Sequence, residues 1–556
     1  MTNENPELKK QQSISAAEHP KAWDPQVMIL GLPLAVVGCI IGLELIVRTG
    51  VTPNTSIIGA LFAILLSRIP VAFLRKYRSI HRQNLLQTSI SAATFSAANC
   101  MILPIGIPVI MGYPELMFPM LIGVMLATCV DATILYNCFG SEMFPAEGAW
   151  PPGVAAADSI LAVIEKGKKA VLLLVGIGLG WVGKIAGLPM DLLGVSWFGD
   201  FGAMAALAAG SLVIGVLKVN GFSFSIFGHA FNFVTNAFGE GFVYTDHLSL
   251  QYMAHGVMIG AGIISLVQCG IALFKKSKGT KTVDTTNVVS NEHMKKTLGV
   301  GFGAYLVIAL FLAVVGGIIT KMSVPQFILW LIFAAFAAEA SELIVGISAM
   351  YSGWFPGFAT ALIFLIVGML LGFPKLALGL LVGFTAATGP CFSDMAYDLK
   401  CGYILRGSGA NPELEKEGRK QQFFAELMGF AVAFVMVAFF ANKYFGQGLF
   451  VAVSNTFVAT IDAGASGEIA KWLLIWAIPG AIIQLLGGKR QLGILFATGL
   501  LVGNIINGLT IAAGLIIRLI AVRANKENEQ TLNILGAGAL AGAAIYSFLT
   551  ATLGLV

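Results

Sequence analysis

The sequence has 556 residues, of which 57% are hydrophobic and only 11% are charged. A soluble domain carries about 25% charged residues, so this composition excludes an ordinary soluble protein. The formal net charge of +5 comes from lysines and arginines in short connections. This distribution disfavours a nucleic-acid-binding surface and is typical of the cytoplasmic loops of membrane proteins.

Apolar segments recur from residue 26 to the end of the sequence, and charged residues fall almost entirely between them. A hydrocarbon core of about 30 Å needs about 20 apolar residues in a helix. The segments that reach this length include 26–47, 115–139, 250–274, 297–319 and 531–556. They lack the alternation of β-barrel strands. The sequence therefore predicts an all-α polytopic membrane bundle of about 16 spans, with two pseudo-repeat halves and re-entrant or broken helices.

Polar segments divide the sequence into four parts. Residues 1–25 form a polar tail without the apolar region of a secretory signal peptide. Two membrane halves follow, at 26–274 and 297–556, and a polar linker at 275–296 separates them. Basic residues in the tail and the linker predict a multi-pass protein of the cell (inner) membrane with its N-terminus in the cytoplasm. Two halves around a midplane site are typical of duplicated transporters.

The third apolar block opens with amides and hydroxyls. On a helix, Asn84, Gln87, Thr88 and Ser91 fall on one face. This face could line a hydrophilic cavity and hydrogen-bond a peptide-like solute. Polar contacts that hold neighbouring helices together are an equally good interpretation.

Prolines break the helical pattern at two places. Pro104 and Pro108 interrupt the third apolar block, and irregular backbone at membrane depth is stable only where protein or a water-filled cavity satisfies it. Three prolines and two glycines also stop any continuous helix over 144–153. We expect a non-helical turn there, in which Glu147 would face a ligand. An ordinary surface loop is the alternative.

The sequence lacks convincing motifs for a dinucleotide or a metal. Gly178, Gly180 and Gly183 match a dinucleotide-binding pattern, but no strand precedes them. They are better interpreted as helix–helix contacts, since Gly176 and Gly180 also form G-x-x-x-G. The cysteines and histidines show no metal-ligand spacing. The sequence therefore predicts neither a cofactor nor a bound metal.

The segment 220–247 is too polar for a lipid-facing helix and too apolar for a free loop. At near one-turn spacing, His229, Asn232 and Asn236 could line a pathway through the protein. His229 could titrate near neutral pH, although a lone histidine is more often a hydrogen-bonded structural residue.

Acidic residues inside apolar segments are costly to bury and suggest function. Glu339 and Glu342 stand three residues apart, so one helical face presents both carboxylates. Burial beside a like charge should raise the proton affinity of one of them toward neutral pH. With Asp131, they are predicted to couple transport to protons, and a pair hydrogen-bonded to another helix is the alternative. Asn504 and Asn507 add amide partners for a ligand.

A further pair of acids leads to a family resemblance. Asp394 and Asp398 lie one helical turn apart, and Lys400 can neutralise one of them. With this stretch, the sequence resembles the oligopeptide transporter family, which includes the yellow stripe-like metal–chelate carriers, and the resemblance covers essentially the whole chain from about residue 26 onward. The segments similar to that family's motifs, in the family's order, are Gln83–Thr88, Pro145–Ala149 and Asp398–Tyr403.

The resemblance implies a secondary carrier of small peptides or metal–chelate complexes, in which Asp394, Asp398 and Lys400 belong to a gating motif. We expect proton symport by alternating access in the lipid bilayer, with no enzymatic activity and no nucleic-acid partner. A proton- or sodium-coupled carrier of amino acids or another small organic solute is the alternative. Gly-rich helix faces are compatible with a homodimer and equally with packing inside one chain.

Overall fold

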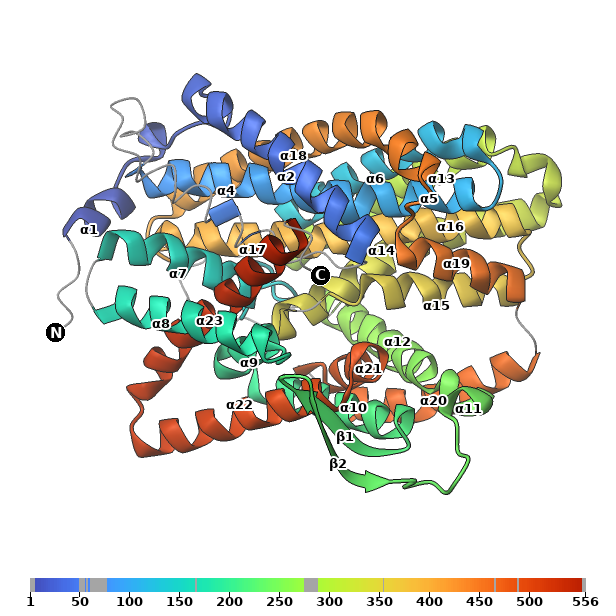
Figure 1. Cartoon of the computed structure of the whole chain (residues 1–556). Helices are drawn as coiled ribbons and strands as arrows, with labels where there is room; N and C mark the ends of the chain where they lie inside the picture. The colour runs from blue at the N-terminus through green and yellow to red at the C-terminus, as the bar shows by residue number, and fades with distance from the viewer. Residues whose placement is uncertain are drawn as a thin grey trace.

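The computed structural model describes residues 6–49, 56, 59–60, 78–165, 168–274, 289–353, 355–464, 467–487 and 490–552. Helices and their connections make up these residues apart from one β-hairpin (Figure 1). Ten described helices are long and apolar enough to cross a membrane, and shorter apolar helices accompany them. The predicted all-α membrane bundle is confirmed.

The elements before the linker are α1 (Pro6–Gln12), α2 (Pro25–Thr49), α4 (Ile80–Phe95), η3 (Ser96–Ile102), α5 (Leu103–Ile110), α6 (Met117–Cys138), α7 (Pro151–Glu165), α8 (Lys168–Ile185), α9 (Met190–Phe198), α10 (Phe201–Lys218), β1 (Gly221–Ile226), β2 (His229–Thr235), α11 (Leu248–Gln251) and α12 (Met253–Phe274). Those after it are α13 (Asn291–Val315), α14 (Val324–Ser352), α15 (Gly357–Leu370), α16 (Lys375–Ala387), α17 (Pro390–Leu405), α18 (Pro412–Gly446), α19 (Ala452–Ala463), α20 (Gly467–Gly487), α21 (Leu492–Val502), α22 (Ile505–Ala524) and α23 (Asn528–Thr552).

The helices form two groups that lie side by side in Figure 1. The first group contains α2, α4 to α6 and α13 to α19, with α4 packed between α2, α17 and α18. In the second group, α8 packs against α23, α10 against α21 and α22, and α12 against α20. Each group therefore contains helices from both membrane halves of the sequence.

Glycines allow the helix backbones of the second group to approach closely. Gly176 and Gly180 of α8 lie against carbonyl oxygens of α23, and Gly538 and Gly542 of α23 lie against carbonyl oxygens of α8. A side chain at any of these positions would collide with backbone, which a small shift cannot relieve. The interpretation as helix–helix contacts is confirmed for Gly176 and Gly180 and is wrong for Gly178, where a side chain would meet nothing within 4 Å.

We predict that Gly180→Val destabilises the protein by about 1–3 kcal/mol, because the new side chain must displace the α23 backbone. Thermal unfolding in detergent measures this change. Gly178→Val is the matched control, since it places the same side chain on the same helix where nothing lies within 4 Å. Equal losses of stability in the two variants would show that the close contact with α23 is not the cause of the loss.

Two long helices of the first group are irregular near their middles. The helix that begins at Ile80 widens into the π-helical stretch η3 and continues as α5, with Pro104 in the first turn of α5. The interruption predicted there is thus a π-helical segment within a continuous helix. Between α16 and α17 the helix breaks at Thr388 and Gly389. Such irregular turns free backbone groups for other contacts, and both lie next to the buried acids described below.

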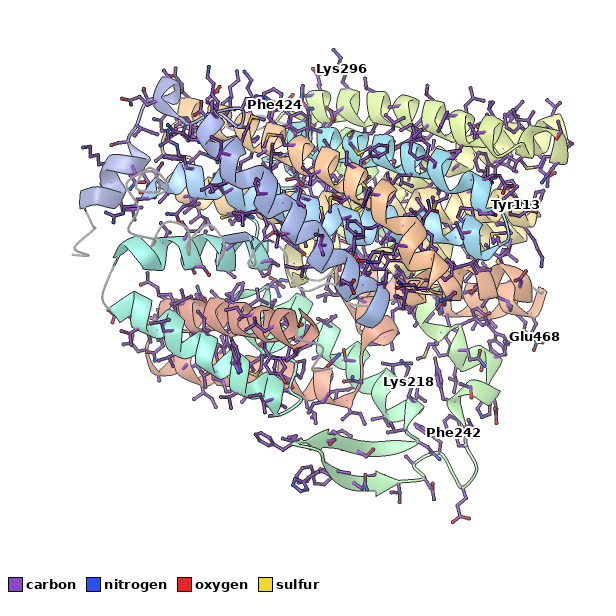
Figure 2. The ribbon with its side chains drawn as sticks, turned by 45° about the horizontal axis from the view of Figure 1, so that its top comes forward. Tyr113, Lys218, Phe242, Lys296, Phe424 and Glu468 are labelled. Atoms are coloured by element: carbon purple, nitrogen blue, oxygen red, sulfur yellow. The ribbon has the colours of Figure 1, made fainter. Side chains whose placement is uncertain are left out.

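Residues 221–235 form a β-hairpin, in which β2 is exposed and β1 is mostly half-buried. Figure 2 shows it beside the helices of the second group, with Phe242 in the connection that follows it. The two residues between the strands, Phe227 and Gly228, have φ values of 50° and 75°. Positive values at both positions are typical of a two-residue type I′ turn.

The helical spacing predicted for His229, Asn232 and Asn236 is wrong. All three are exposed, and the first two lie in β2. The physical reason is that phenylalanines alternate with other residues here, which gives the period of two of a strand. Phe224 accordingly stacks on the rings of Phe231 and Phe233 across the hairpin.

Candidate functional site

The polar residues predicted to share one face of α4 do so, and that face is buried. Their side chains are at most 2% exposed, and three of them have partners on α17 or α18, whereas Asn84 contacts Gln87 and Arg406. The residues are Asn84, Gln87, Thr88 and Ser91. Because protein groups satisfy them in this conformation, the interpretation as contacts between helices is confirmed, and binding of a substrate by them stays a prediction.

The centre of α4 donates hydrogen bonds to the two aspartates of α17. Gln87 Nε2 lies 2.5 Å from Asp398 Oδ1, and Ser91 Oγ lies 3.2 Å from Asp394 Oδ2. Ser56 Oγ donates a further hydrogen bond of 2.6 Å to Asp398 Oδ1. These three donors to the aspartates are all neutral side chains.

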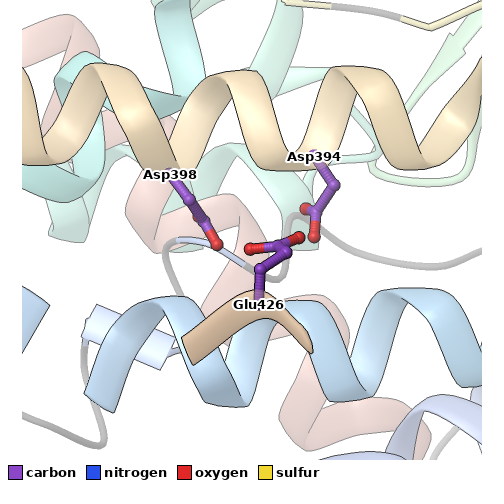
Figure 3. Close-up of side chains that lie close together, drawn as sticks. All are labelled: Asp394, Asp398 and Glu426. Carbon is purple, nitrogen blue, oxygen red and sulfur yellow. The ribbon is translucent and has the colours of Figure 1, made fainter. Parts of the chain in front are cut away.

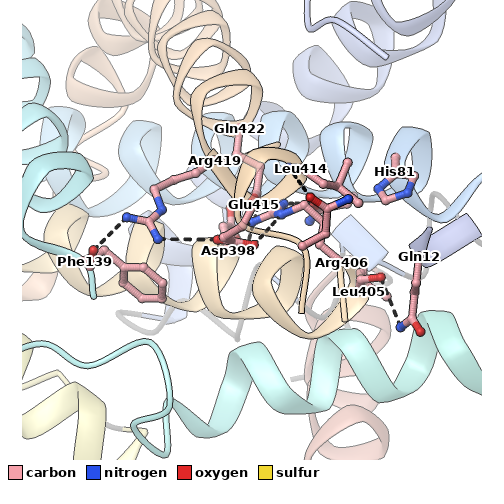
Figure 4. Close-up of polar contacts among 12 residues, drawn as sticks. Gln12, His81, Phe139, Asp398, Leu405, Arg406, Leu414, Glu415, Arg419 and Gln422 are labelled. Atoms are coloured by element: carbon pink, nitrogen blue, oxygen red, sulfur yellow. Dashed lines mark hydrogen bonds and ion pairs between the residues drawn. The ribbon is translucent and has the colours of Figure 1, made fainter. Parts of the chain in front are cut away.

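A buried arginine organises the end of this network nearest the N-terminus (Figure 4). Arg406 is 1% exposed, and its Nε and Nη2 donate to the two oxygens of Glu415 at 2.7 and 3.1 Å. Its Nη1 donates to Gln422 Oε1 at 2.8 Å and to Asn84 Oδ1 at 3.3 Å. Gln422 in turn donates to Thr88 Oγ1 at 3.1 Å. The arginine thus joins α17, α18 and α4.

Three carboxyl groups meet beside this network. Asp394, Asp398 and Glu426 each offer an oxygen atom, and these atoms lie within 4.8 Å of one another (Figure 3). The three side chains are 3%, 0% and 1% exposed. Neither oxygen of Glu426 has a hydrogen-bond partner, and neither has Asp398 Oδ2. We call this cluster the carboxylate triad.

A second acidic cluster joins α6, α13 and α14. Asp131 and Glu342 are fully buried and lie beside each other, and neither Asp131 Oδ1 nor Glu342 Oε1 has a hydrogen-bond donor. Tyr305 Oη donates to Glu342 Oε2 at 2.7 Å, and the backbone nitrogen of Phe392 donates to Asp131 Oδ2 at 2.7 Å. A hydrogen bond between the two groups would satisfy these oxygens, and it needs a proton on one of them, because two carboxylates are both acceptors.

Glu339 lies near this pair without joining it. Its side chain is partly buried, and its Oε2 has no hydrogen-bond partner. The structure thus pairs Glu342 with Asp131 instead of with Glu339. A pair hydrogen-bonded to another helix, the alternative set against proton coupling, matches the observed contacts.

The prediction that Lys400 neutralises a neighbouring aspartate is wrong. Lys400 Nζ donates to the carbonyl oxygen of Ala146 at 2.8 Å. Lys400 follows Asp398 by two positions, which turns its side chain about 200° around the helix axis. Glu147 accepts a hydrogen bond of 2.9 Å from Tyr403 Oη. The turn that carries Glu147 thus docks on a different face of α17 from the triad, and ligand binding by Glu147 stays a prediction.

The remaining predicted amides lie in the second group of helices. Asn504 is the N-cap of α22, and its Oδ1 accepts a hydrogen bond of 2.9 Å from the backbone nitrogen of Asn507. An exposed cap satisfies the end of a helix, which explains why an asparagine stands there. The structure does not bring these residues, or those of the hairpin, to the acidic clusters.

Several residues of the site were not predicted from the sequence. Glu426 lies in the apolar stretch FFAELMGFAVAFVMVAFF, so the criterion that selected Glu339 would also have found it. Arg406 and Glu415 flank a polar connection, and nothing in their spacing predicts a buried pair. Tyr305 is a single tyrosine in an apolar run, whose role depends on packing.

The N-terminal tail covers the end of the bundle next to Arg406. Gln11 Oε1 accepts a hydrogen bond of 2.8 Å from the backbone nitrogen of Ile80, at the start of α4. The backbone nitrogen of Ala22 donates to Gln421 Oε1 of α18 at 2.9 Å. The tail is therefore docked on the ends of two helices that form the site.

His19 lies in the docked tail, and its protonation is linked to docking. Its ring centroid lies 4.9 Å from that of His81. Burial, together with repulsion from His81 and Arg406, lowers the pKa of His19 from 6.5 to about 3. A released tail would bind a proton below about pH 6.5, whereas the docked tail would not. Docking is thus strongest above pH 6.5 and weakens as the pH falls toward 3.

We predict that a change from pH 7.5 to pH 5.5 weakens tail docking by about 1.4 kcal/mol, or about tenfold. Cleavage by trypsin at Lys9, Lys10 and Lys21 measures release of the tail. His19→Gln at each pH is the control, because it cancels the pH dependence of the protease. A ratio of wild-type to variant cleavage that does not rise on acidification would contradict this role of His19.

Comparison with known families fits this arrangement. A family model described as OPT oligopeptide transporter protein matches residues 22–273 and 247–553. No curated protein matches the chain. The matched residues include every helix that carries the two acidic clusters. The chain belongs to the oligopeptide transporter family and is a multi-pass membrane transporter.

Proposed function

We propose that the protein carries short peptides, or peptide-like and metal–chelate solutes, by proton symport, with its N-terminus in the cytoplasm. We assign proton coupling to the Asp131–Glu342 pair. The observation that supports this most directly is that two fully buried carboxyl groups lie side by side, each with one oxygen that has no hydrogen-bond donor. A hydrogen bond between them needs one proton, and loss of this proton would leave two facing anions.

The contacts of the pair suggest where its charge resides. Phe392 lies in the first turn of α17, and the N-terminus of a helix favours an anion. The negative charge is therefore best placed on Asp131, with the proton toward Glu342. When the proton leaves, repulsion between the two side chains favours a conformation in which α6 and α14 separate or water enters.

Helix α17 links the proton site to the polar face of α4. Its first turn holds Asp131, and Asp394 and Asp398 farther along it accept from Ser91 and Gln87. The break before Gly389 provides a hinge between α16 and α17. If α17 moves away from α4, the freed amide and hydroxyl groups can hydrogen-bond the backbone of a peptide. This movement is a route to alternating access.

Glu342→Gln and Asp131→Asn should each abolish accumulation of peptides against a gradient, because an amide cannot release the coupling proton. We expect both variants to keep exchange of peptide across the membrane at equal concentrations. Proteoliposomes with an imposed pH gradient measure accumulation of di- to hexapeptides, and counterflow measures exchange.

The matched control is Glu468→Gln, which makes the same change at an exposed position of α20. It should leave both processes unchanged. Accumulation that persists in the Asp131 and Glu342 variants would eliminate the pair as the coupling site. Strict dependence on sodium, without an effect of a protonophore, would eliminate proton symport itself.

A further inference from the structure

The carboxylate triad of Asp394, Asp398 and Glu426 has a chemistry that the proton pair does not explain. We infer that the triad is a binding site for a hard divalent cation of the size of Ca²⁺ or Mn²⁺. The site differs from Asp131–Glu342 in its residues and its helices. Its existence does not depend on which solute the protein carries.

The geometry of the triad fits such an ion. Figure 3 shows Glu426 reaching from α18 into the space between the two aspartates of α17. The oxygen atoms lie within 4.8 Å of one another. Oxygen ligands on opposite sides of Ca²⁺ are about 4.6–5.2 Å apart, because each lies about 2.3–2.6 Å from the ion. The spacing of the three oxygens therefore matches one ion of this size.

Glu426 supplies an independent indication of a ligand. Its side chain is 1% exposed and points into the triad, yet neither of its oxygens has a hydrogen-bond partner. Asp398 Oδ2 is in the same condition. Buried carboxylate oxygens without donors are very unfavourable. A cation in the space between them would satisfy these oxygens at once.

The hydrogen bonds made to Asp398 leave its outer oxygen available. Asp398 Oδ1 accepts from both Ser56 and Gln87, which stabilises the anion and leaves Oδ2 for a ligand. The nearby cations have other partners, since Lys400 donates to a backbone carbonyl and Arg406 to Glu415. Neither Asp398 nor Glu426 forms an ion pair with another described residue.

The donor atoms select the class of ion. All three ligands are carboxylate oxygens, which suit Ca²⁺, Mn²⁺ and Mg²⁺, whereas Zn²⁺ and Cu⁺ prefer nitrogen and sulfur ligands. A divalent cation neutralises more of the negative charge of three carboxylates than Na⁺ does. A bound ion would tie α17 to α18. Because the site is closed, we expect binding and release to be slow.

Electron paramagnetic resonance of Mn²⁺ tests the proposal without any transport assay. Purified full-length protein is treated with a chelator, freed of it, and incubated for a long period with Mn²⁺ in the absence of peptide. We expect one Mn²⁺ bound per chain, displaced by Ca²⁺ but not by Na⁺. Glu426→Gln and Asp398→Asn should each weaken binding by about tenfold or more.

Glu339→Gln is the matched control, since it removes another acid of the same group of helices and should leave Mn²⁺ binding unchanged. The melting temperature of each variant without metal verifies that it is folded. Absence of saturable Mn²⁺ binding to the wild-type protein would overturn the proposal, and so would unchanged binding in both triad variants. Because no peptide is present, failure of peptide transport would not affect this result.

Discussion

The cost of burying carboxyl groups in a membrane bundle is the constraint on which the rest of this structure depends. The Asp131–Glu342 pair is fully buried, and among the described residues no basic side chain forms an ion pair with it. Neutral donors and the start of α17 supply part of the stabilisation. In the proposed mechanism, the remainder comes from a proton between the paired acids, which can leave. Under this proposal the packing of the bundle responds to ion gradients.

The two groups of helices are held together by different interactions. In the second group, reciprocal glycine contacts such as those of Gly180 and Gly538 bring backbones together and leave little room for movement. In the first group, polar side chains join α4, α17 and α18, and both long helices contain irregular turns. This contrast is consistent with a rigid frame and a group of helices that can change their partners.

The sequence predicted what depends on local periodicity and failed where contacts between distant segments decide. The shared face of Gln87 and Ser91 follows from helical geometry, and so does the orientation of Lys400, although charge alone suggested a different partner for it. Alternating phenylalanines in 221–235 already indicated strands. The pairing of Asp131 with Glu342 joins segments more than 200 residues apart in a single buried contact. No spacing rule in one sequence identifies such a pair.

The central claim is that a proton resides between two buried carboxyl groups. Infrared difference spectroscopy between the wild-type protein and the Asp131→Asn/Glu342→Gln double variant tests it most directly, because a protonated carboxyl group has a carbonyl stretch distinct from that of a carboxylate. At neutral pH we predict one such band in the wild-type protein that is absent from the double variant. Wild-type protein in which both groups absorb only as carboxylates would contradict the claim.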